Sequence, residues 1–302
     1  MAKVAANGIT LDCEVFGKPA DPALVLVMGL GLPGVFWPDA FVQGLVAGGF
    51  RVVRFDNRDC GWSQRIEGGP HTPIPVATAR SLMGLPVPAP YDLSDMAADV
   101  TGLMDALGIG RAHAVGASLG GMVAQVLAAR WPDRVASLVS IMSSSGNPWV
   151  SAARPRALAA ILHRPANPAD HDALVRHFMH LFEVIGSHRL PQRPEEMRAL
   201  CERAAARGYD VHGTARQLLA VLASGDRRAE LGRVRAPTLV IHGTDDPLVP
   251  RSAGRDVARH ITGAKLLEFD GMGHDLPPSL MPEIIGAIVA HCRQAAVSDT
   301  GV

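Results

Sequence analysis

The feature that most constrains the fold of this chain is a series of short, mainly apolar segments that alternate with helix-like stretches. Segments of this length and composition indicate strands that are buried on both faces of a sheet. They lie at residues 23–29, 51–56, 113–118, 137–142, 237–243 and 264–269. Strands that alternate with helices predict a mostly parallel sheet with helices on both faces, which is an α/β fold.

The N-terminus predicts an antiparallel addition to this sheet. Asn7-Gly8 suits the positive φ angles of a tight hairpin turn, and residues 9–16 behind it are rich in β-prone side chains. The hairpin and the six later segments together predict eight strands.

The strand signal is missing from a long central part of the chain. Residues 147–232 are rich in Ala, Arg, Leu and His, with helical spacing and proline punctuation. We therefore predict a core formed by residues 1–146 and 233–302, interrupted by a helical cap at 147–232.

Smaller boundaries are also readable. Gly48-Gly49 is expected to end a helix that starts near Pro38, and Ser94 is a candidate N-cap for the next helix. The proline-rich residues 68–90 are expected to form a long loop. Two interpretations of this loop stay open, a wall of a functional site or a surface excursion.

The overall composition favours a small-molecule partner. The 302 residues are 48% hydrophobic and carry 29 basic and 29 acidic side chains, which gives no sign of a nucleic-acid or anionic membrane surface. The cysteines are spread without a CxxC pair, which suits reduced thiols in the cytoplasm; they are Cys13, Cys60, Cys201 and Cys292. The chain is expected neither to carry a secretion signal nor to span a membrane.

Residues 116–120 match the motif G-x-S-x-G, with Ser118 at its centre. In this motif a serine stands on a strained turn between a strand and a helix, and its Oγ is exposed for nucleophilic attack. A predicted strand precedes Ser118 and a helical pattern follows it, as the motif requires. The alternative is a serine that merely caps the following helix.

A serine nucleophile needs a histidine base and a carboxylate that orients it, in the order Ser, acid, His on this kind of fold. Asp245 and Asp246 follow the strand at 237–243, and Asp246 is preferred because Pro247 keeps its backbone extended. Asp245 is expected to be a solvated carboxylate. His274 follows the last strand and is the expected base, whereas His242 is expected to be structural.

Acyl transfer also needs two backbone N–H groups that stabilise the oxyanion. Leu119, directly after the candidate nucleophile, is one expected donor. Leu30 is the other, since Gly29 before it permits close approach to a ligand. Gly29 and Met28 are accordingly expected to contact the substrate. No metal is expected, because the pair His177 and His180 lacks further ligands nearby.

Five blocks in order resemble the α/β-hydrolase superfamily. They are LVMGLGLPGVFWPDAF, RVVRFDNRDCGWS, VGASLGGM, HGTDDPLVP and GMGHDLP. Within the superfamily they are most similar to carboxylic ester hydrolases of the aclacinomycin methylesterase type. This resemblance implies a triad of Ser118, Asp246 and His274 and no cofactor. Two positions depart from the common pattern: Met28 stands where a histidine is frequent, and Asp59 where a glycine is frequent.

The residues and the resemblance together predict a serine carboxylesterase that acts on hydrophobic or medium-sized esters. Relatives that use aspartate in place of Ser118, such as haloalkane dehalogenases and epoxide hydrolases, are disfavoured. A lactonase, thioesterase, perhydrolase or carbon-carbon bond hydrolase could keep the same triad and remains an alternative. A protein that retains the fold but only binds its ligand is the alternative of a different class.

Overall fold

The computed structural model describes residues 2–190 and 193–299 of the chain. Its centre is one eight-stranded sheet with the strand order β1-β2-β4-β3-β5-β6-β7-β8. The strands are β1 (Ala2–Ala6), β2 (Ile9–Phe16), β3 (Ala23–Val27), β4 (Arg51–Phe55), β5 (Ala112–Ala117), β6 (Val135–Ile141), β7 (Thr238–Gly243) and β8 (Lys265–Phe269).

The sheet has an antiparallel edge and a parallel body. β1 pairs antiparallel with β2, and β2 pairs antiparallel with β4. From β4 to β8 every neighbouring pair is parallel. The hairpin between β1 and β2 turns at Asn7 and Gly8, with φ angles of 49° and 77°. The predicted eight-stranded, mostly parallel sheet is therefore confirmed.

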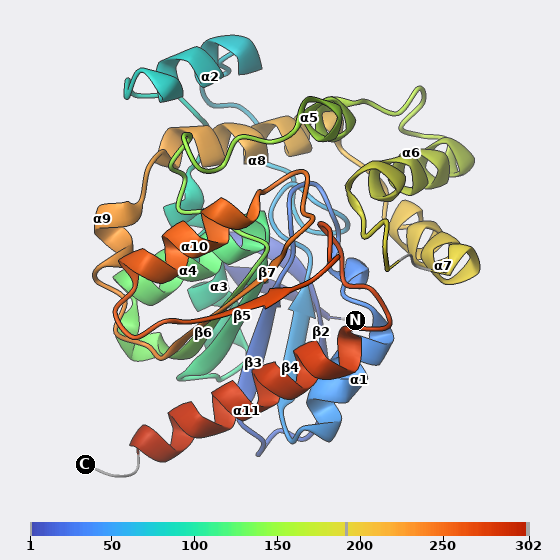
Figure 1. The fold of residues 1–302 in the computed structure, drawn as a ribbon. Coiled ribbons are helices and arrows are strands. Elements are labelled where there is room, and N and C mark those ends of the chain that lie inside the picture. Colours follow the sequence, from blue (N-terminus) through green and yellow to red (C-terminus); the bar gives the residue numbers. More distant parts are fainter. Residues whose placement is uncertain (1, 191–192, 300–302) are drawn as a thin grey trace.

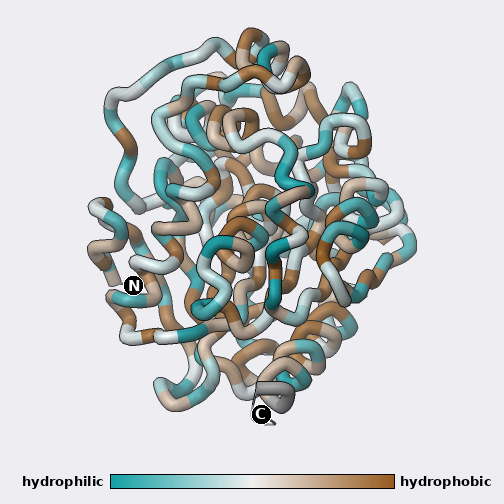
Figure 2. Tube along the Cα trace, turned by 90° about the vertical axis from the view of Figure 1, so that its left-hand side faces the viewer, coloured by the Kyte–Doolittle hydropathy of each residue, from teal (hydrophilic) through white to brown (hydrophobic). Residues whose placement is uncertain are grey.

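Helices cover both faces of the sheet (Figure 1). α3 (Leu93–Ala106), α4 (Leu119–Arg130) and α10 (Arg251–His260) contribute buried side chains to one core cluster. α1 (Asp39–Ala47) and α11 (Met281–Asp299) contribute to the cluster on the other side. In Figure 2 the apolar positions run through the middle of the molecule, whereas hydrophilic positions gather on its outer loops. These two clusters hold the helices against the sheet. The sheet is therefore a firm base for the loops at its carboxyl edge.

Between β6 and β7 the chain forms helices and, among its described residues, no strand. The helices are α5 (Pro155–Leu162), α6 (His171–Ile185), α7 (Pro194–Ala205), α8 (Val211–Ser224) and α9 (Arg228–Leu231). Figure 1 shows α5 to α8 above the carboxyl ends of the strands. We call residues 147–232 the insert; its limits as a separate cap stay a prediction.

Two local predictions were wrong. Residues 68–90 are not a structureless loop, because they contain α2 (Ile74–Leu82), which starts after Pro73. Ala77 of α2 packs against Leu219 of α8, and this apolar contact stabilises the helix. The N-cap of α3 is Asp92 and not Ser94.

Asp92 occupies the N-cap position and forms a capping box with Asp95. Its side chain accepts from the backbone N–H groups of Ser94 and Asp95, and the Asp95 carboxylate accepts from the N–H of Asp92. The end of α1 is as predicted, with Gly48 as C-cap and Gly49 at a φ of 87°. In the part of the chain that the structure describes, no helix is long and apolar enough to cross a membrane.

Candidate active site

Ser118 stands on a sharp turn between β5 and α4. Its φ of 55° and ψ of −121° lie in a region that side-chain-bearing residues rarely adopt. The glycines on either side make this turn possible. A Cβ on Gly116 would collide with the carbonyl group of Gly120, and a Cβ on Gly120 would collide with that of Val27 in β3. The motif therefore folds into the strained turn that its sequence predicts.

His274 and Asp246 meet at the carboxyl edge of the sheet. The Nδ1 atom of His274 lies 2.7 Å from Oδ2 of Asp246, and both side chains are buried. The other oxygen, Oδ1 of Asp246, accepts from the backbone N–H groups of Leu248 and Val249 at 2.9 and 2.8 Å. An ionised carboxylate only accepts hydrogen bonds, so the proton of the imidazole stays on Nδ1 and Nε2 is free to act as a base.

Asp245 is turned away from this pair. Its Oδ2 accepts from Nε of Arg189 at 2.9 Å, and both side chains are about half exposed. This ion pair lowers the pKa of the Asp245 carboxyl. Of the two candidate acids, only Asp246 contacts His274.

The loop that carries His274 is held by the end of α6. The backbone N–H of His274 donates to the carbonyl oxygen of Ile185 at 2.8 Å, and that of Gly273 donates to Oγ of Ser187 at 2.8 Å. Oγ of Ser187 in turn bonds the carboxylate of Asp275. The insert thus helps to position the loop that carries the imidazole of His274. The sequence did not indicate this role.

His242 is a buried neighbour of the acid and has a different partner. Its Nε2 lies 2.7 Å from the carbonyl oxygen of Val249 and 3.7 Å from Oδ2 of Asp246. Burial lowers the pKa of His242, so the ring is neutral and donates from Nε2 to Val249. This matches the structural role expected for it.

The candidate oxyanion donors lie on two segments beside Ser118. Leu119 is the first residue of α4, whose N-terminal N–H groups have no partner within the helix. Gly29 lies in the turn after β3, directly beside Ser118. A Cβ on Gly29 would lie 3.3 Å from Cβ of Ser118. Leu30, next in the chain, belongs to the same turn. We call residues 28–32 the oxyanion turn.

A cavity of about 590 Å³ opens onto Ser118 and His274. Met28 and Gly29 line it, but residues 68–90 do not. Most of its remaining wall is apolar, with a few charged side chains from α1 and α7, Asp39, Glu196 and Arg203. Its wall from the insert includes Phe182, Met197 and Leu200, which sequence reasoning missed. Their helical spacing indicates an apolar helix face, but not that this face lines a cavity.

The histidines of α6 lie close to a third imidazole. Nδ1 of His177 is 3.3 Å from Nδ1 of His163, and the ring of His180 also contacts His163. Within the described residues, no group of three or more His, Cys, Asp or Glu side chains could hold a metal ion.

A family model of the alpha/beta hydrolase fold matches residues 22–277 of the sequence. The chain belongs to the alpha/beta hydrolase fold family. Among its named relatives, a rhodomycin D methylesterase from Streptomyces peucetius is 31% identical over 97% of this chain and 98% of its own length. A second rhodomycin D methylesterase, from Streptomyces sp. strain C5, is 29% identical over the same shares. The predicted fold, the hydrolase family and the resemblance to methylesterases are confirmed.

Solved structures of other hydrolases share the whole fold of this alpha/beta hydrolase. The enol-lactonase from Burkholderia xenovorans LB400 superposes with a TM-score of 0.73 and 26% identity, over 96% of this chain and 99% of that one. A meta-cleavage product hydrolase from Pseudomonas fluorescens IP01 gives a TM-score of 0.74 at 20% identity, over 98% of both chains. The second likeness concerns the fold alone.

Proposed function

We propose that this alpha/beta hydrolase is a serine carboxylic ester hydrolase with Ser118 as nucleophile, His274 as base and Asp246 as the acid that orients it. Two observations on His274 support the proposal together. Its Nδ1 lies 2.7 Å from Oδ2 of Asp246, and its side chain lines the same cavity as Ser118. Ser118 itself stands on a strained turn that exposes a side chain at the carboxyl edge of the sheet.

The chemistry follows from these positions. Oγ of Ser118 attacks the ester carbonyl while Nε2 of His274 takes its proton, and Asp246 stabilises the imidazolium. The backbone N–H groups of Leu30 and Leu119 stabilise the tetrahedral oxyanion. His274 then protonates the leaving alcohol, and water activated by the same imidazole releases the acid.

The cavity supports a substrate with a hydrophobic body of medium size. Its volume of about 590 Å³ lies in the range of small-ligand pockets, and its walls are mainly apolar. The methylesterase names of the relatives support an ester with a small alcohol, so that the bulk of the substrate is its acyl part. Met28 and Gly29 would contact the substrate near the reacting carbonyl. The function needs no cofactor, and a cytoplasmic location stays a prediction.

A lactone is the second candidate substrate, because the enol-lactonase from Burkholderia xenovorans LB400 shares the whole fold at 26% identity. A lactone is a cyclic ester, so the same triad and oxyanion donors would open it. Thioester hydrolysis, perhydrolysis and carbon-carbon bond hydrolysis remain alternatives on the same residues.

The deciding experiment combines active-site labelling with a substrate panel. Intact mass after treatment with a fluorophosphonate should show one adduct on the wild type and none on Ser118→Ala. A panel of methyl and p-nitrophenyl esters and of lactones should be turned over by the wild type, and at least about a thousandfold more slowly by Ser118→Ala. Absence of both labelling and turnover would sink the proposal and favour a ligand-binding protein.

A further inference from the structure

The oxyanion turn is held from outside by two side-chain amides, one from the core and one from the insert. We propose that Gln217, on α8 of the insert, is a positioning residue that sets the peptide carrying the Leu30 N–H. This inference rests on the proposed function, since it assigns that N–H to the oxyanion. It concerns how the donor is aimed, and not which residues react.

The turn has a defined shape. The carbonyl oxygen of Gly29 accepts a long hydrogen bond, 3.4 Å, from the N–H of Leu32, and Gly31 has a φ of 65°. A positive φ at the third of four residues is the requirement of a type II turn. In a trans peptide the C=O and N–H groups point in opposite directions. The direction of the Gly29 carbonyl therefore also sets the direction of the Leu30 N–H.

The two amides bind the turn on either side of this peptide. Nδ2 of Asn57, from the loop after β4, donates to the carbonyl oxygen of Met28 at 2.9 Å. Oε1 of Gln217 accepts from the N–H of Gly31 at 2.8 Å. The Gly29–Leu30 peptide lies between these two fixed points, so its rotation is restricted from both ends.

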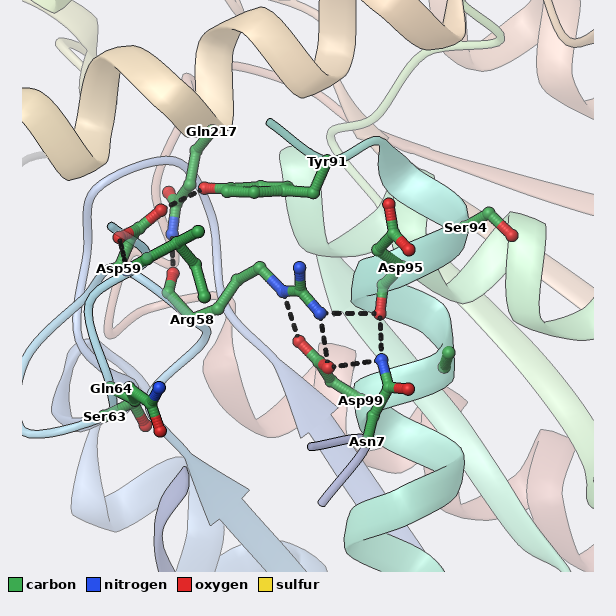
Figure 3. Close-up of polar contacts among 12 residues, drawn as sticks. Asn7, Arg58, Asp59, Ser63, Gln64, Tyr91, Ser94, Asp95, Asp99 and Gln217 are labelled. Carbon is green, nitrogen blue, oxygen red and sulfur yellow. Dashed lines mark hydrogen bonds and ion pairs between the residues drawn. The ribbon is translucent and has the colours of Figure 1, made fainter. Parts of the chain in front are cut away.

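Gln217 is fully buried, and each end of its amide has a hydrogen-bond partner. Its Nε2 donates to the carbonyl oxygen of Arg58 at 2.7 Å, while its Oε1 holds Gly31. One partner is a donor and the other an acceptor, so the hydrogen bonds assign the two ends of the amide. Figure 3 shows Gln217 descending from α8 onto Arg58, beside Asp59 and Tyr91. A side chain that must satisfy both contacts has one orientation.

The neighbouring residue fixes the helix in place. Arg216 forms a bidentate ion pair with the carboxylate of Asp59. Its Nε donates to Oδ2 at 2.9 Å, and its Nη2 donates to Oδ1 at 2.6 Å. Asp59 is fully buried, has a φ of 66°, and accepts from the hydroxyl of Tyr91 at 2.6 Å. The departure from the family pattern at Asp59, where a glycine is frequent, thus supplies the anchor for α8. The backbone keeps the left-handed conformation that suits glycine.

α8 also touches the turn directly. A Cβ on Gly31 would lie 2.7 Å from Oγ1 of Thr214, so the helix leaves no room for a side chain there. The insert therefore limits the shape of the oxyanion turn by contact as well as by the hydrogen bond of Gln217.

Two variants of Gln217 test the inference. Gln217→Met keeps the length of the side chain but removes both hydrogen bonds. Gln217→Asn keeps an amide, but it is one methylene too short to reach Gly31 and Arg58 together, and it decides the question if the methionine variant does not fold. Ser224→Ala is the matched control, because Ser224 links the same helix to the core through the N–H of Leu93 at 3.0 Å, away from the turn.

The measurements are kcat and KM on an ester that the wild type hydrolyses, with active sites titrated to completion by a fluorophosphonate. We expect kcat per titrated site to fall about ten- to a hundredfold in both Gln217 variants, with KM changed less than threefold. A trifluoromethyl ketone, whose adduct carries an oxyanion, should bind more weakly by a similar factor. Ser224→Ala should match the wild type in both measurements.

The possible failures are distinguishable. If the wild type neither labels nor hydrolyses any ester, the proposed function is wrong and this inference falls with it. If the wild type is active and the Gln217 variants only lose thermal stability, with kcat per titrated site unchanged, Gln217 is a structural residue and the inference alone is overturned.

Discussion

Ser118, the proposed nucleophile, has a strained backbone. A non-glycine residue at its φ of 55° costs on the order of 1–3 kcal/mol, and such strain persists only where the surroundings enforce it. Here the enforcement comes from the tight contacts of Gly116 and Gly120 with their neighbours. The motif was readable because its glycines have this steric purpose and are not interchangeable with other small residues.

The choice between two adjacent acids is a prediction at the same scale. Asp246→Asn should lower kcat by about 10⁴-fold, because the amide no longer fixes the tautomer of His274 or stabilises its charged form. Asp245→Asn should stay within about threefold of the wild type, because it loses only a half-exposed ion pair with Arg189. Initial rates on one ester, measured with both variants, check this. An inactive Asp245→Asn beside an active Asp246→Asn would reverse the assignment.

Among the elements, α6 carries a buried histidine whose pKa is strongly lowered. His177 is 6% exposed, and burial, with the nearby His163 and His180, lowers its pKa to about 4. An unfolded histidine has a pKa near 6.5, so between about pH 4 and 6.5 the unfolded chain binds more protons than the folded one. Above pH 6.5 the ring is neutral in both states, and the full stabilisation of the folded state is present. As the pH falls from 6.5 toward 4, the unfolded chain takes up a proton that the folded protein does not, and the free energy of unfolding decreases.

We predict that His177→Gln flattens the pH dependence of stability in this window. The wild type should lose about 2 kcal/mol of unfolding free energy through His177 between pH 7 and pH 4, and the variant should lose that much less. Urea unfolding at several pH values measures the difference. His171→Gln, at an exposed position of the same helix, is the control. Equal pH slopes for His177→Gln and wild type would contradict the prediction.

Elements were predictable where a local signal decides them. The strands followed from their apolar runs, and the first hairpin from Asn7-Gly8. α2 was missed because its prolines suggested a loop, whereas proline in the first turn favours a helix start. What holds α2 is its packing against α8, which lies far away in the sequence. A local pattern does not contain that contact.

The site shows the same division between local and distant causes. The candidate order Ser118, Asp246, His274 was readable, because the acid and the histidine each follow a recognisable strand. The role of Gln217 was not, because it depends on a hydrogen bond to Gly31 across 186 positions of sequence. The family pattern did mark Asp59 as unusual, but only the structure shows that Arg216 is its partner.

At the scale of the whole molecule, the insert and the core share one interior. A single core cluster joins Val139 and Ile141 of β6 to Phe178 of α6 and Cys201 of α7. Charged contacts cross the same boundary: Arg207, between α7 and α8, donates to Asp12 and Asp56 at 2.9 Å each, with all three side chains buried. Removing one partner of such a buried network costs about 3–5 kcal/mol, so the insert is held firmly to the sheet.

A firmly held insert makes the cavity wall a determinant of substrate size. Phe182 of α6 lines the cavity at Ser118 and also a neighbouring cavity of about 290 Å³, and its ring lies 5.2 Å from that of Phe36. Phe182→Ala should join the two spaces, because the surrounding helices are fixed and do not collapse into the gap. The variant should therefore shift the optimum of a p-nitrophenyl ester series toward longer acyl chains by several carbons.

The comparison is kcat/KM across acyl chains from acetyl to dodecanoyl, for the wild type and Phe182→Ala. Leu158→Ala is the control, because Leu158 is a 47% exposed residue on α5 of the same insert and does not line either cavity. We expect at least a tenfold gain in the ratio of long-chain to short-chain kcat/KM for Phe182→Ala, since several methylenes gain apolar contact. An unchanged profile would mean that the acyl chain does not run toward α6. The acyl chain would then extend along another part of the wall, such as the apolar side chains of Met281 and Ile285 on α11.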